Sequence, residues 1–195
     1  MSPRFSPISI STQLSWPRRV PEAGPLKVLG IDPGTAVMGF GVVESMPGRQ
    51  SRLIECGTLT TGARDPLPSR LRVLHDGVSA LIGRHAPDAV AVECAFYGKN
   101  VRTAVVLSHA RGVILLAAEM AGVEIAEYSP ALIKKTIVGR GAALKPQVGY
   151  MVAQLLRLKA PPTPDDAADG VAVALTHLMI SSQRLVFARQ TITAR

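Results

Sequence analysis

The sequence predicts an α/β fold, a single domain with a mixed five-stranded sheet flanked by helices. Three apolar runs follow one another near the N-terminal end, separated only by turn residues, which predicts an antiparallel meander of three strands. From residue 68 onward, helix-like and strand-like patterns alternate, as they do where strands lie parallel. A chain of 195 residues with 47% hydrophobic residues can bury one substantial core, and two domains would be crowded.

The strands of the meander are short and apolar. They are expected at residues 26–31, 37–44 and 52–60. The turns between them contain Pro33-Gly34 and Pro47-Gly48, dipeptides that favour a reversal of the chain. Gly39 and Gly41 lie within the second strand, where a missing side chain leaves room for the close approach of another backbone.

The rest of the domain alternates helices with strands. Helices are expected at residues 68–85, 100–121, 129–138, 146–158 and 165–181, and strands at residues 89–92 and 123–127, the second of these at or near a sheet edge. Pro87, Gly122 and Gly139 follow three of the helices directly or closely, as residues that end helices commonly do. This order of elements predicts helices on both faces of the sheet.

The two ends of the chain are expected to lie outside the domain, which spans residues 26–181. Residues 1–25 are rich in Ser, Pro and Arg, which indicates a disordered basic tail or a start codon placed too far upstream, and residues 182–195 are expected to form a C-terminal tail. No apolar run approaches the roughly 20 residues needed to cross a bilayer, and a secretory signal is not recognisable. We therefore expect no membrane contact. Cys56 and Cys94 are too few for a disulfide framework, so we expect reduced thiols in a cytoplasmic protein.

Four acidic residues stand where predicted elements begin or end. Asp32 and Glu93 close two apolar strands, and Asp166 and Asp169 open the last helix, three residues apart on one face. Because buried charge is costly unless it is paired or bound to metal, such acids favour a shared cation. Four carboxylates can hold two divalent ions about 3.5–4 Å apart, and oxygen ligands favour Mg²⁺ or Mn²⁺ over Zn²⁺. Taken singly, each acid has a simpler interpretation. Asp32 can be a turn former and Glu93 a surface acid, and Asp166 and Asp169 can stabilise the start of a helix that Asp165 caps.

The charge of the chain is strongly basic and unevenly distributed. The formal net charge is +8. Between residues 99 and 159, three acidic residues face nine basic ones, namely Lys99, Arg102, Arg111, Lys134, Lys135, Arg140, Lys145, Arg157 and Lys159. This asymmetry indicates either a surface that faces nucleic acid or a solubilising charge. Acids gathered at strand ends in a basic chain favour metal-dependent chemistry on an anionic polymer.

Taken in order along residues 26–181, these motifs resemble the RuvC family of Holliday junction resolvases. The matching residues are Leu29-Gly30-Ile31-Asp32-Pro33-Gly34, Val92-Glu93 with Phe96 and Lys99-Asn100, Ala110-Arg111-Gly112, Lys134 with Thr136 and Val138-Gly139, Lys145-Pro146-Gln147-Val148, and Asp166-Ala167-Ala168-Asp169 with Thr176-His177. Each motif alone is weak evidence, and the ordered set is strong.

The resemblance implies an RNase H-like fold and a homodimer. It also implies Mg²⁺-dependent nicking of two opposing strands of a four-way DNA junction during recombination and repair, which leaves 5′-phosphate and 3′-hydroxyl ends. A branch-migration motor, RuvA with RuvB, is the implied partner. By motif position the catalytic, metal-binding acids are Asp32, Glu93, Asp166 and Asp169. Lys134 and Lys145 match positions that contact DNA phosphates.

Further DNA contacts are expected just after Glu93. Phe96, Tyr97 and Lys99 lie in a turn-like stretch, where an exposed aromatic ring can stack on an unpaired base. The alternative is that Phe96 packs beneath the loop. Looser candidates for DNA contact are Lys135, Arg140 and Arg111, the last of which lies in an apolar helix and has an alternative structural role.

The helix at residues 100–121 is apolar on nearly every side, so it needs covering on more than one face. The sheet can cover one face, and either a second copy of the chain or another helix can cover the other. His109 and His177 lie in apolar helical stretches and are expected to be core residues rather than ligands.

Two other classes of protein fit part of the pattern. Asp32-Pro33-Gly34-Thr35 also suits the first phosphate loop of actin-like ATPases and sugar kinases, but those proteins need a second domain for which 195 residues leave no room. A junction-binding protein without catalysis would keep the basic face but would not need four acids.

Overall fold

The computed structural model describes residues 25–47, 50–94 and 101–193, with the backbone alone described at 101–103 and 183–193. One sheet has the strand order β3-β2-β1-β4-β5. The strands are β1 (Lys27–Asp32), β2 (Val37–Met46), β3 (Gln50–Thr60), β4 (Ala89–Glu93) and β5 (Glu124–Tyr128). β1, β2 and β3 pair antiparallel, while β4 lies parallel to β1 and β5 parallel to β4. The predicted meander with added parallel strands is therefore confirmed, as is the edge position of the last strand.

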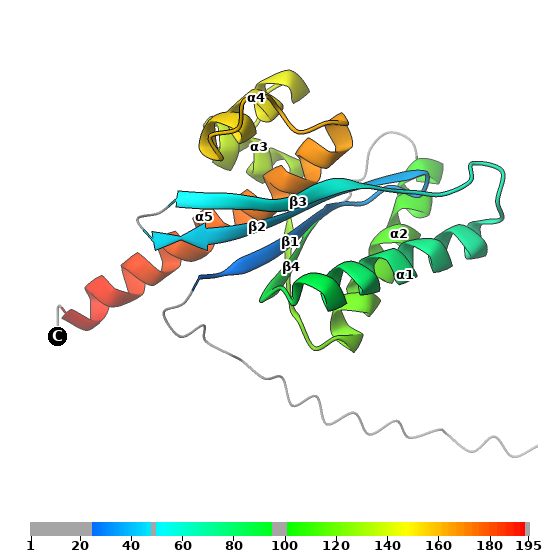
Figure 1. Ribbon diagram of the computed structural model, residues 1–195, viewed down its shortest axis with the longest axis horizontal. Coiled ribbons are helices and arrows are strands. Elements are labelled where there is room, and N and C mark those ends of the chain that lie inside the picture. The colour runs from blue at the N-terminus through cyan, green and yellow to red at the C-terminus, as the bar shows by residue number, and fades with distance from the viewer. Residues whose placement is uncertain (1–24, 48–49, 95–100, 194–195) are drawn as a thin grey trace, which may run out of the picture.

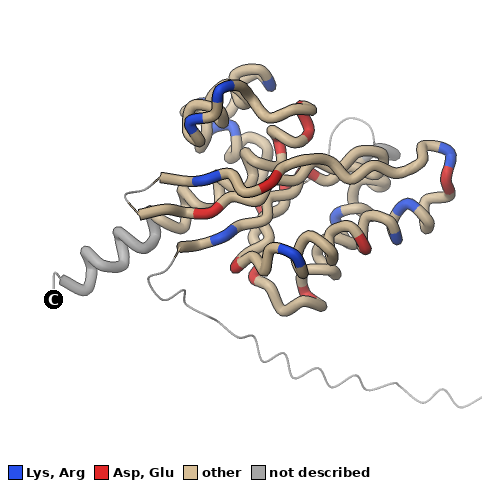
Figure 2. The backbone as a smooth tube through the Cα atoms, viewed as in Figure 1, with Lys and Arg blue, Asp and Glu red and all other residues tan. Residues whose placement is uncertain are grey.

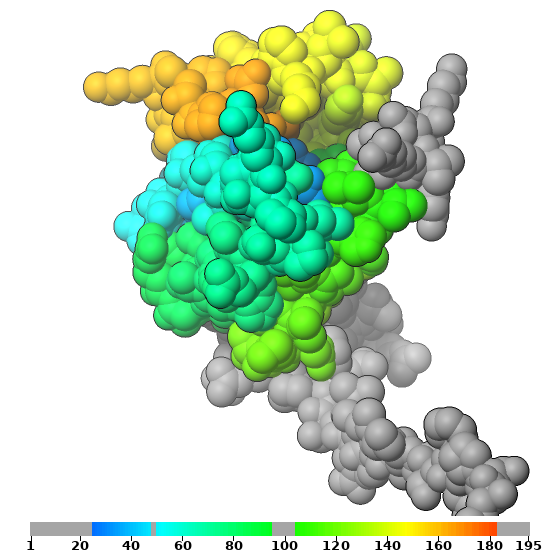
Figure 3. Space-filling view, turned by 90° about the vertical axis from the view of Figure 1, so that its right-hand side faces the viewer, coloured from blue at the N-terminus to red at the C-terminus, as the bar shows by residue number. Residues whose placement is uncertain are grey.

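Helices cover both faces of the sheet (Figure 1). They are α1 (Leu67–His85), α2 (Val101–Met120), α3 (Pro130–Val138), α4 (Lys145–Leu155) and α5 (Asp165–Thr193). Two apolar clusters fill the layers: one joins the sheet to α1 and α2, and the other joins it to α3, α4 and α5. Figure 3 shows the α3–α4 layer and the α1–α2 layer on opposite sides of the strands.

The alternation of side chains along β1 explains why the sheet has two cores. Val28 belongs to the cluster with α3, α4 and α5, whereas Leu29 and Ile31 belong to the cluster with α1 and α2. Successive side chains of a strand point to opposite faces, so a short apolar run buried on both faces is the pattern expected of a central strand.

Glycine brings α5 against the backbone of the sheet. A Cβ atom at Gly30 would lie 2.3 Å from the carbonyl oxygen of Gly170 and from the amide nitrogen of Ala174. No side chain fits in that space, so the helix axis can pass close to β1 only because residue 30 is glycine.

The last helix is longer than predicted. It was expected to end at residue 181, but it continues to Thr193, so most of the expected C-terminal tail is helical and extends past the sheet in Figure 1. The chain has neither Gly nor Pro from residue 171 to residue 193 that would stop a helix. The expected N-terminal tail lies outside the described residues, apart from Pro25.

The strand ends agree with the prediction in a way that matters for the site. Asp32 and Glu93 are the last residues of β1 and β4, with Asp32 opposite Gly39 and Glu93 opposite Tyr128. Their backbones are therefore held by the sheet.

Among the described residues, no helix is both long enough and apolar enough to span a membrane.

Candidate active site

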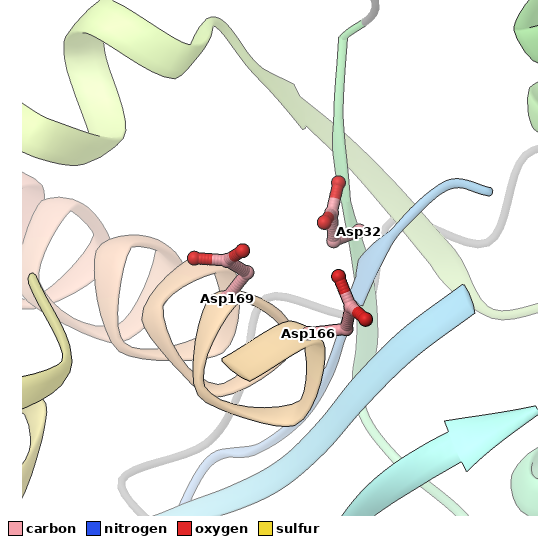
Figure 4. A group of neighbouring side chains, drawn as sticks. All are labelled: Asp32, Asp166 and Asp169. Atoms are coloured by element: carbon pink, nitrogen blue, oxygen red, sulfur yellow. The ribbon is translucent and has the colours of Figure 1, made fainter. Parts of the chain in front are cut away.

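Three of the four predicted acids meet at the end of the sheet. Asp32, Asp166 and Asp169 each offer a carboxylate oxygen, and these oxygens all lie within 4.8 Å of one another. Figure 4 shows Asp32 at the end of β1 facing the two aspartates from the start of α5. All three residues are half-buried. Asp165, the first residue of α5, is exposed.

The position of α5 beside Asp32 depends on the residue opposite Asp32 in β2. That residue is Gly39, and a Cβ atom there would lie 1.8 Å from the carbonyl oxygen of Asp166. The first turn of α5 thus rests on a strand position that has no side chain. Because Asp166 and Asp169 are three residues apart in a helix, both then project toward Asp32.

The turn that follows Asp32 is held by two residues that the sequence did not single out. The carbonyl oxygen of Thr35 accepts a hydrogen bond from the Thr61 hydroxyl at 2.6 Å and one from Nε of Arg70 at 3.0 Å. The amide of Thr61 donates to the carbonyl oxygen of Ala36 at 3.0 Å. No local pattern predicts these contacts, since the partners lie 26 and 35 residues beyond Thr35.

Glu93 faces the same pocket from the neighbouring strand. β4 runs parallel to β1, so the two strands end at the same edge of the sheet. The residues that line the pocket are Asp32, Glu93, Pro130, Ile133, Lys134, Lys145, Val148, Asp169 and Ala172. Glu93 lies outside the group of three carboxylates within 4.8 Å. The four predicted acids therefore lie at the same end of the sheet, with Glu93 outside the tight group of three.

Burial and mutual repulsion change the acidity of this site. Burial, and next the charge of Asp169, raise the pKa of Asp32 to about 6, although Lys145 opposes this. Burial, and next the charges of Asp32 and Asp169, raise the pKa of Glu93 to about 7. Such raised pKa values are typical of a site with too little positive charge for its carboxylates.

The donor set fits a hard divalent cation. Mg²⁺ binds oxygen ligands at about 2.0–2.1 Å, so ligands on opposite sides of the ion stand about 4 Å apart. The oxygens of Asp32, Asp166 and Asp169, within 4.8 Å of one another, are close to that span. A bound cation would also relieve the repulsion that raises the pKa values of Asp32 and Glu93.

Two lysines supply positive charge from the helices that cover the pocket. Lys134 lies in α3, which is capped at both ends. The hydroxyl of Ser129, just before the helix, accepts from the Leu132 amide at 3.3 Å, and Gly139, just after it, has a φ of 87°. Lys145 is the first residue of α4, and its Nζ donates to Oδ2 of Asp169 at 2.6 Å. This contact raises the pKa of Lys145. Figure 2 shows further basic residues along the layer of α3 and α4.

The other predicted DNA contacts divide into three groups. Phe96, Tyr97 and Lys99 lie outside the described residues. Lys135 and Arg140 are exposed on α3 and on the turn after it. Arg111 forms an ion pair with Glu127, which supports its structural alternative.

Arg111 joins α2 to the edge strand. Its Nε and Nη2 atoms donate to the two carboxylate oxygens of Glu127 in β5, at 2.5 and 2.6 Å. Of the two predicted core histidines, His177 is buried, but His109 is exposed, and its ring bonds back to the carbonyl oxygen of Val105 at 2.7 Å. The prediction for His109 was wrong because α2 has an outward face in this chain.

Comparisons with known proteins show which family the sequence resembles. A sequence model of the family described as crossover junction endodeoxyribonuclease RuvC matches residues 28–177. A crossover junction endodeoxyribonuclease RuvC from Syntrophomonas wolfei is 48% identical over 153 residues, which cover 78% of this chain and 88% of the relative.

Solved structures give the same result for the fold. Thermus thermophilus RuvC superposes with a TM-score of 0.74 at 36% identity, covering 81% of this chain and 96% of that one. The structure of T. thermophilus RuvC in complex with a Holliday junction substrate also gives a TM-score of 0.74, at 33% identity over the same shares of the two chains. The expected RNase H-like architecture is confirmed, and the chain belongs to the RuvC family of crossover junction endodeoxyribonucleases.

Proposed function

We propose that this protein resolves Holliday junctions by cutting two opposing strands of a four-way DNA junction in a metal-dependent reaction. The observation that carries the proposal is the convergence of Asp32, Asp166 and Asp169, whose carboxylate oxygens lie within 4.8 Å of one another. Asp32 and Asp169 line a pocket that Glu93 also lines. The basic chain, with a net charge of +8, suits a polyanionic substrate. Support for the substrate comes from the T. thermophilus relative, which was solved with a Holliday junction.

In this proposal Asp32, Glu93, Asp166 and Asp169 would hold two Mg²⁺ ions, which Mn²⁺ could replace. When bound, the ions supply an activated water and neutralise charge on the leaving 3′ oxygen, which leaves 5′-phosphate and 3′-hydroxyl ends. The protein contributes preorganisation. The backbones of Asp32 and Glu93 are held in the sheet, and Asp166 and Asp169 are held by the contact of α5 with Gly39.

Lys134 and Lys145 are proposed to bind phosphates that flank the cut. Both line the pocket beside the acids, and the side chain of Lys145 is 62% exposed, so solvent or DNA can reach it. A lysine ammonium is a compact charge that suits phosphate oxygens. Phe96, Tyr97 and Lys99 remain proposed contacts to the junction, on the grounds of the family resemblance.

A homodimer is the proposed active form. α2 buries Ala110 and Ile114 against the core, but Val105 is 51%, Leu116 53% and Met120 71% exposed on its other side. These three exposed residues, which we call the α2 outer stripe, are an apolar surface that a second copy could cover by two-fold symmetry. Two active sites related by that axis would match two equivalent strands to be cut.

The setting of the reaction rests on the family alone. We propose that the protein acts in the cytoplasm together with the branch-migration motor RuvA and RuvB. We also propose that residues 26–181 are the nuclease domain and that residues 1–25 are a separate basic tail.

Cleavage of a labelled synthetic four-way junction tests the proposal. The reaction should give paired nicks with Mg²⁺ or Mn²⁺, none with EDTA, and none on a linear duplex of the same sequence. Asp32→Asn and Glu93→Gln should abolish cutting and leave junction binding intact. Tight binding of the junction without nicks under either metal would instead identify a junction-binding protein and refute the proposed catalysis.

A further inference from the structure

A buried polar bond joins the edge strand to the helix that holds two of the acids. The Tyr128 hydroxyl lies 2.9 Å from Nδ1 of His177, and the two rings meet edge to face with centroids 6.0 Å apart. Tyr128 is the last residue of β5 and His177 lies in α5. Both are buried, with 9% and 5% of their surface exposed. Nothing in the proposed reaction uses either residue.

Tyr128 is also the direct neighbour of Glu93 in the sheet. The two residues are register partners between β4 and β5. The carbonyl oxygen of Tyr128 accepts from the amide of Cys94, the residue after Glu93, at 2.8 Å. The backbone that carries Glu93 is thus bonded to Tyr128, and a displacement of Tyr128 would move Glu93 with it.

His177 lies in the same helix as Asp166 and Asp169. It follows Asp169 by eight residues, about two helical turns along α5. Ala172, between them, lines the acidic pocket. A helix is stiff over two turns, so holding His177 limits how α5 can slide or rotate at Asp169.

The edge strand needs such fastening because, within the described part of the chain, a strand pairs with one of its sides alone. β5 has five residues and pairs with β4. Its last two residues are held from opposite faces of the sheet: Glu127 by Arg111 of α2, and Tyr128 by His177 of α5. Contacts on both faces fix the end of the strand at the edge where Glu93 stands.

We propose that Tyr128 and His177 form a positioning pair, which sets the separation of Glu93 from Asp169 and thereby the geometry of the metal site. The inference rests on the proposed function of that site. Two apolar residues of similar size would fill the same space without the cost of burying polar groups. What the hydrogen bond adds is a fixed distance and direction between β5 and α5. A displacement of about 1 Å at a catalytic group is enough to lower the rate strongly.

Single variants of the full-length chain test the pair against a matched control. Tyr128→Phe removes only the hydroxyl, and His177→Leu removes the ring nitrogens. His177→Asn keeps a hydrogen-bonding atom near the position of Nδ1. The control is Thr176→Val, which removes a buried bond from the Thr176 hydroxyl to the carbonyl oxygen of Ala172 at 2.8 Å, within α5 itself. The control therefore destabilises the same helix without touching the link to β5.

Two readouts separate positioning from stability. The first is Mn²⁺ binding to the folded protein without DNA, measured by calorimetry. The second is the single-turnover rate of junction cleavage at saturating protein, with melting temperatures recorded for every variant. Tyr128→Phe and His177→Leu should weaken Mn²⁺ binding about 10-fold, as loss of supporting hydrogen bonds around metal sites does. The double variant, with Tyr128→Phe and His177→Leu together, should bind Mn²⁺ no more weakly than either single variant. His177→Asn should bind Mn²⁺ more tightly than His177→Leu.

One result would overturn the inference and leave the pair a purely structural contact. In that result, Tyr128→Phe and His177→Leu have the same Mn²⁺ affinity and cleavage rate as Thr176→Val, at a similar loss of melting temperature. Additive losses in the double variant would overturn it as well, because they would show that the two residues act separately. Failure of the proposed function would look different: the unaltered protein itself would not nick the junction, whatever Tyr128→Phe does to Mn²⁺ binding.

Discussion

The ammonium nitrogen of Lys145 lies 2.6 Å from Oδ2 of Asp169, so a cation from α4 already occupies one side of the acidic cluster. The Asp169 side chain is 17% exposed and that of Lys145 is 62% exposed. An ion pair at such a rim contributes little to stability, which leaves Lys145 free to exchange Asp169 for a phosphate when metal binds.

Replacement of Lys145 should separate DNA contact from metal binding. In Lys145→Met, cleavage should fall by about 10- to 100-fold, the cost of a lost hydrogen bond to a charged group. Mn²⁺ affinity should not fall, since the competing ammonium is gone from Asp169. Calorimetry and single-turnover cleavage measure the two effects, with Lys145→Arg as the charge-conserving control. A parallel loss of Mn²⁺ affinity would show that Lys145 organises the acids instead.

Metal binding should depend on pH in the neutral range. The raised pKa values of about 6 for Asp32 and about 7 for Glu93 mean that protons compete with the metal. At limiting Mg²⁺, cleavage should therefore rise between about pH 6 and 8, and higher Mg²⁺ should move the midpoint to lower pH. Rate profiles at two Mg²⁺ concentrations check this. Midpoints that coincide at both concentrations would contradict competition between protons and metal.

The metal-free protein should lose stability as pH rises. Asp32 has a folded-state pKa of about 6, above its ordinary value of 3.8, so the folded state retains a proton that the unfolded state releases. The sign of the linkage makes the free energy of unfolding fall between those two pKa values. Asp32→Asn should stabilise the metal-free protein at pH 8 by on the order of 1–3 kcal/mol. Thermal melts in EDTA at pH 5 and pH 8 measure the effect, and Mg²⁺ should reverse it in the unaltered protein. A destabilised Asp32→Asn at pH 8 would contradict the raised pKa.

Gly39 should tolerate no side chain. In Gly39→Ala the new Cβ would meet the Asp166 carbonyl oxygen at 1.8 Å, which is backbone and cannot rotate away. We expect a loss of about 1–3 kcal/mol in stability together with weakened metal binding, because α5 must move from β2. The matched control is Gly83→Ala in α1, where a Cβ meets nothing within 4 Å and should stabilise by roughly 0.5–1 kcal/mol. Intact Mn²⁺ affinity in Gly39→Ala would show that the start of α5 adapts without moving the acids.

The α2 outer stripe should control the oligomeric state. Leu116→Glu places a charge on that face and should weaken self-association at least about 10-fold, converting paired nicks into single nicks. Val73→Glu is the matched control, because Val73 is an exposed apolar residue of α1 with 45% exposure, compared with 53% for Leu116. Sedimentation equilibrium measures the association. Equal association of the two variants would place the dimer interface elsewhere on the molecule.

Local sequence determined most elements of the fold. β2 and α1 begin within one residue of their predicted starts, because apolar periodicity, Pro and Gly act over a few neighbouring residues. The end of α5 was predicted too early, at residue 181. No Gly or Pro between residues 171 and 193 breaks the helix, and α5 continues to Thr193.

The candidate acids were also visible in the sequence, since each stands at the end of an apolar element and the ordered set resembles one family. Only the tertiary structure decided how they meet: Asp32, Asp166 and Asp169 within 4.8 Å of one another, with Glu93 further away. It also decided that Arg111 pairs with Glu127 and that Tyr128 bonds to His177. Such contacts join distant parts of the chain: Tyr128 and His177 are 49 residues apart, and Asp32 and Asp169 are 137 apart. Their distances are set by how strands and helices pack, which no local pattern encodes.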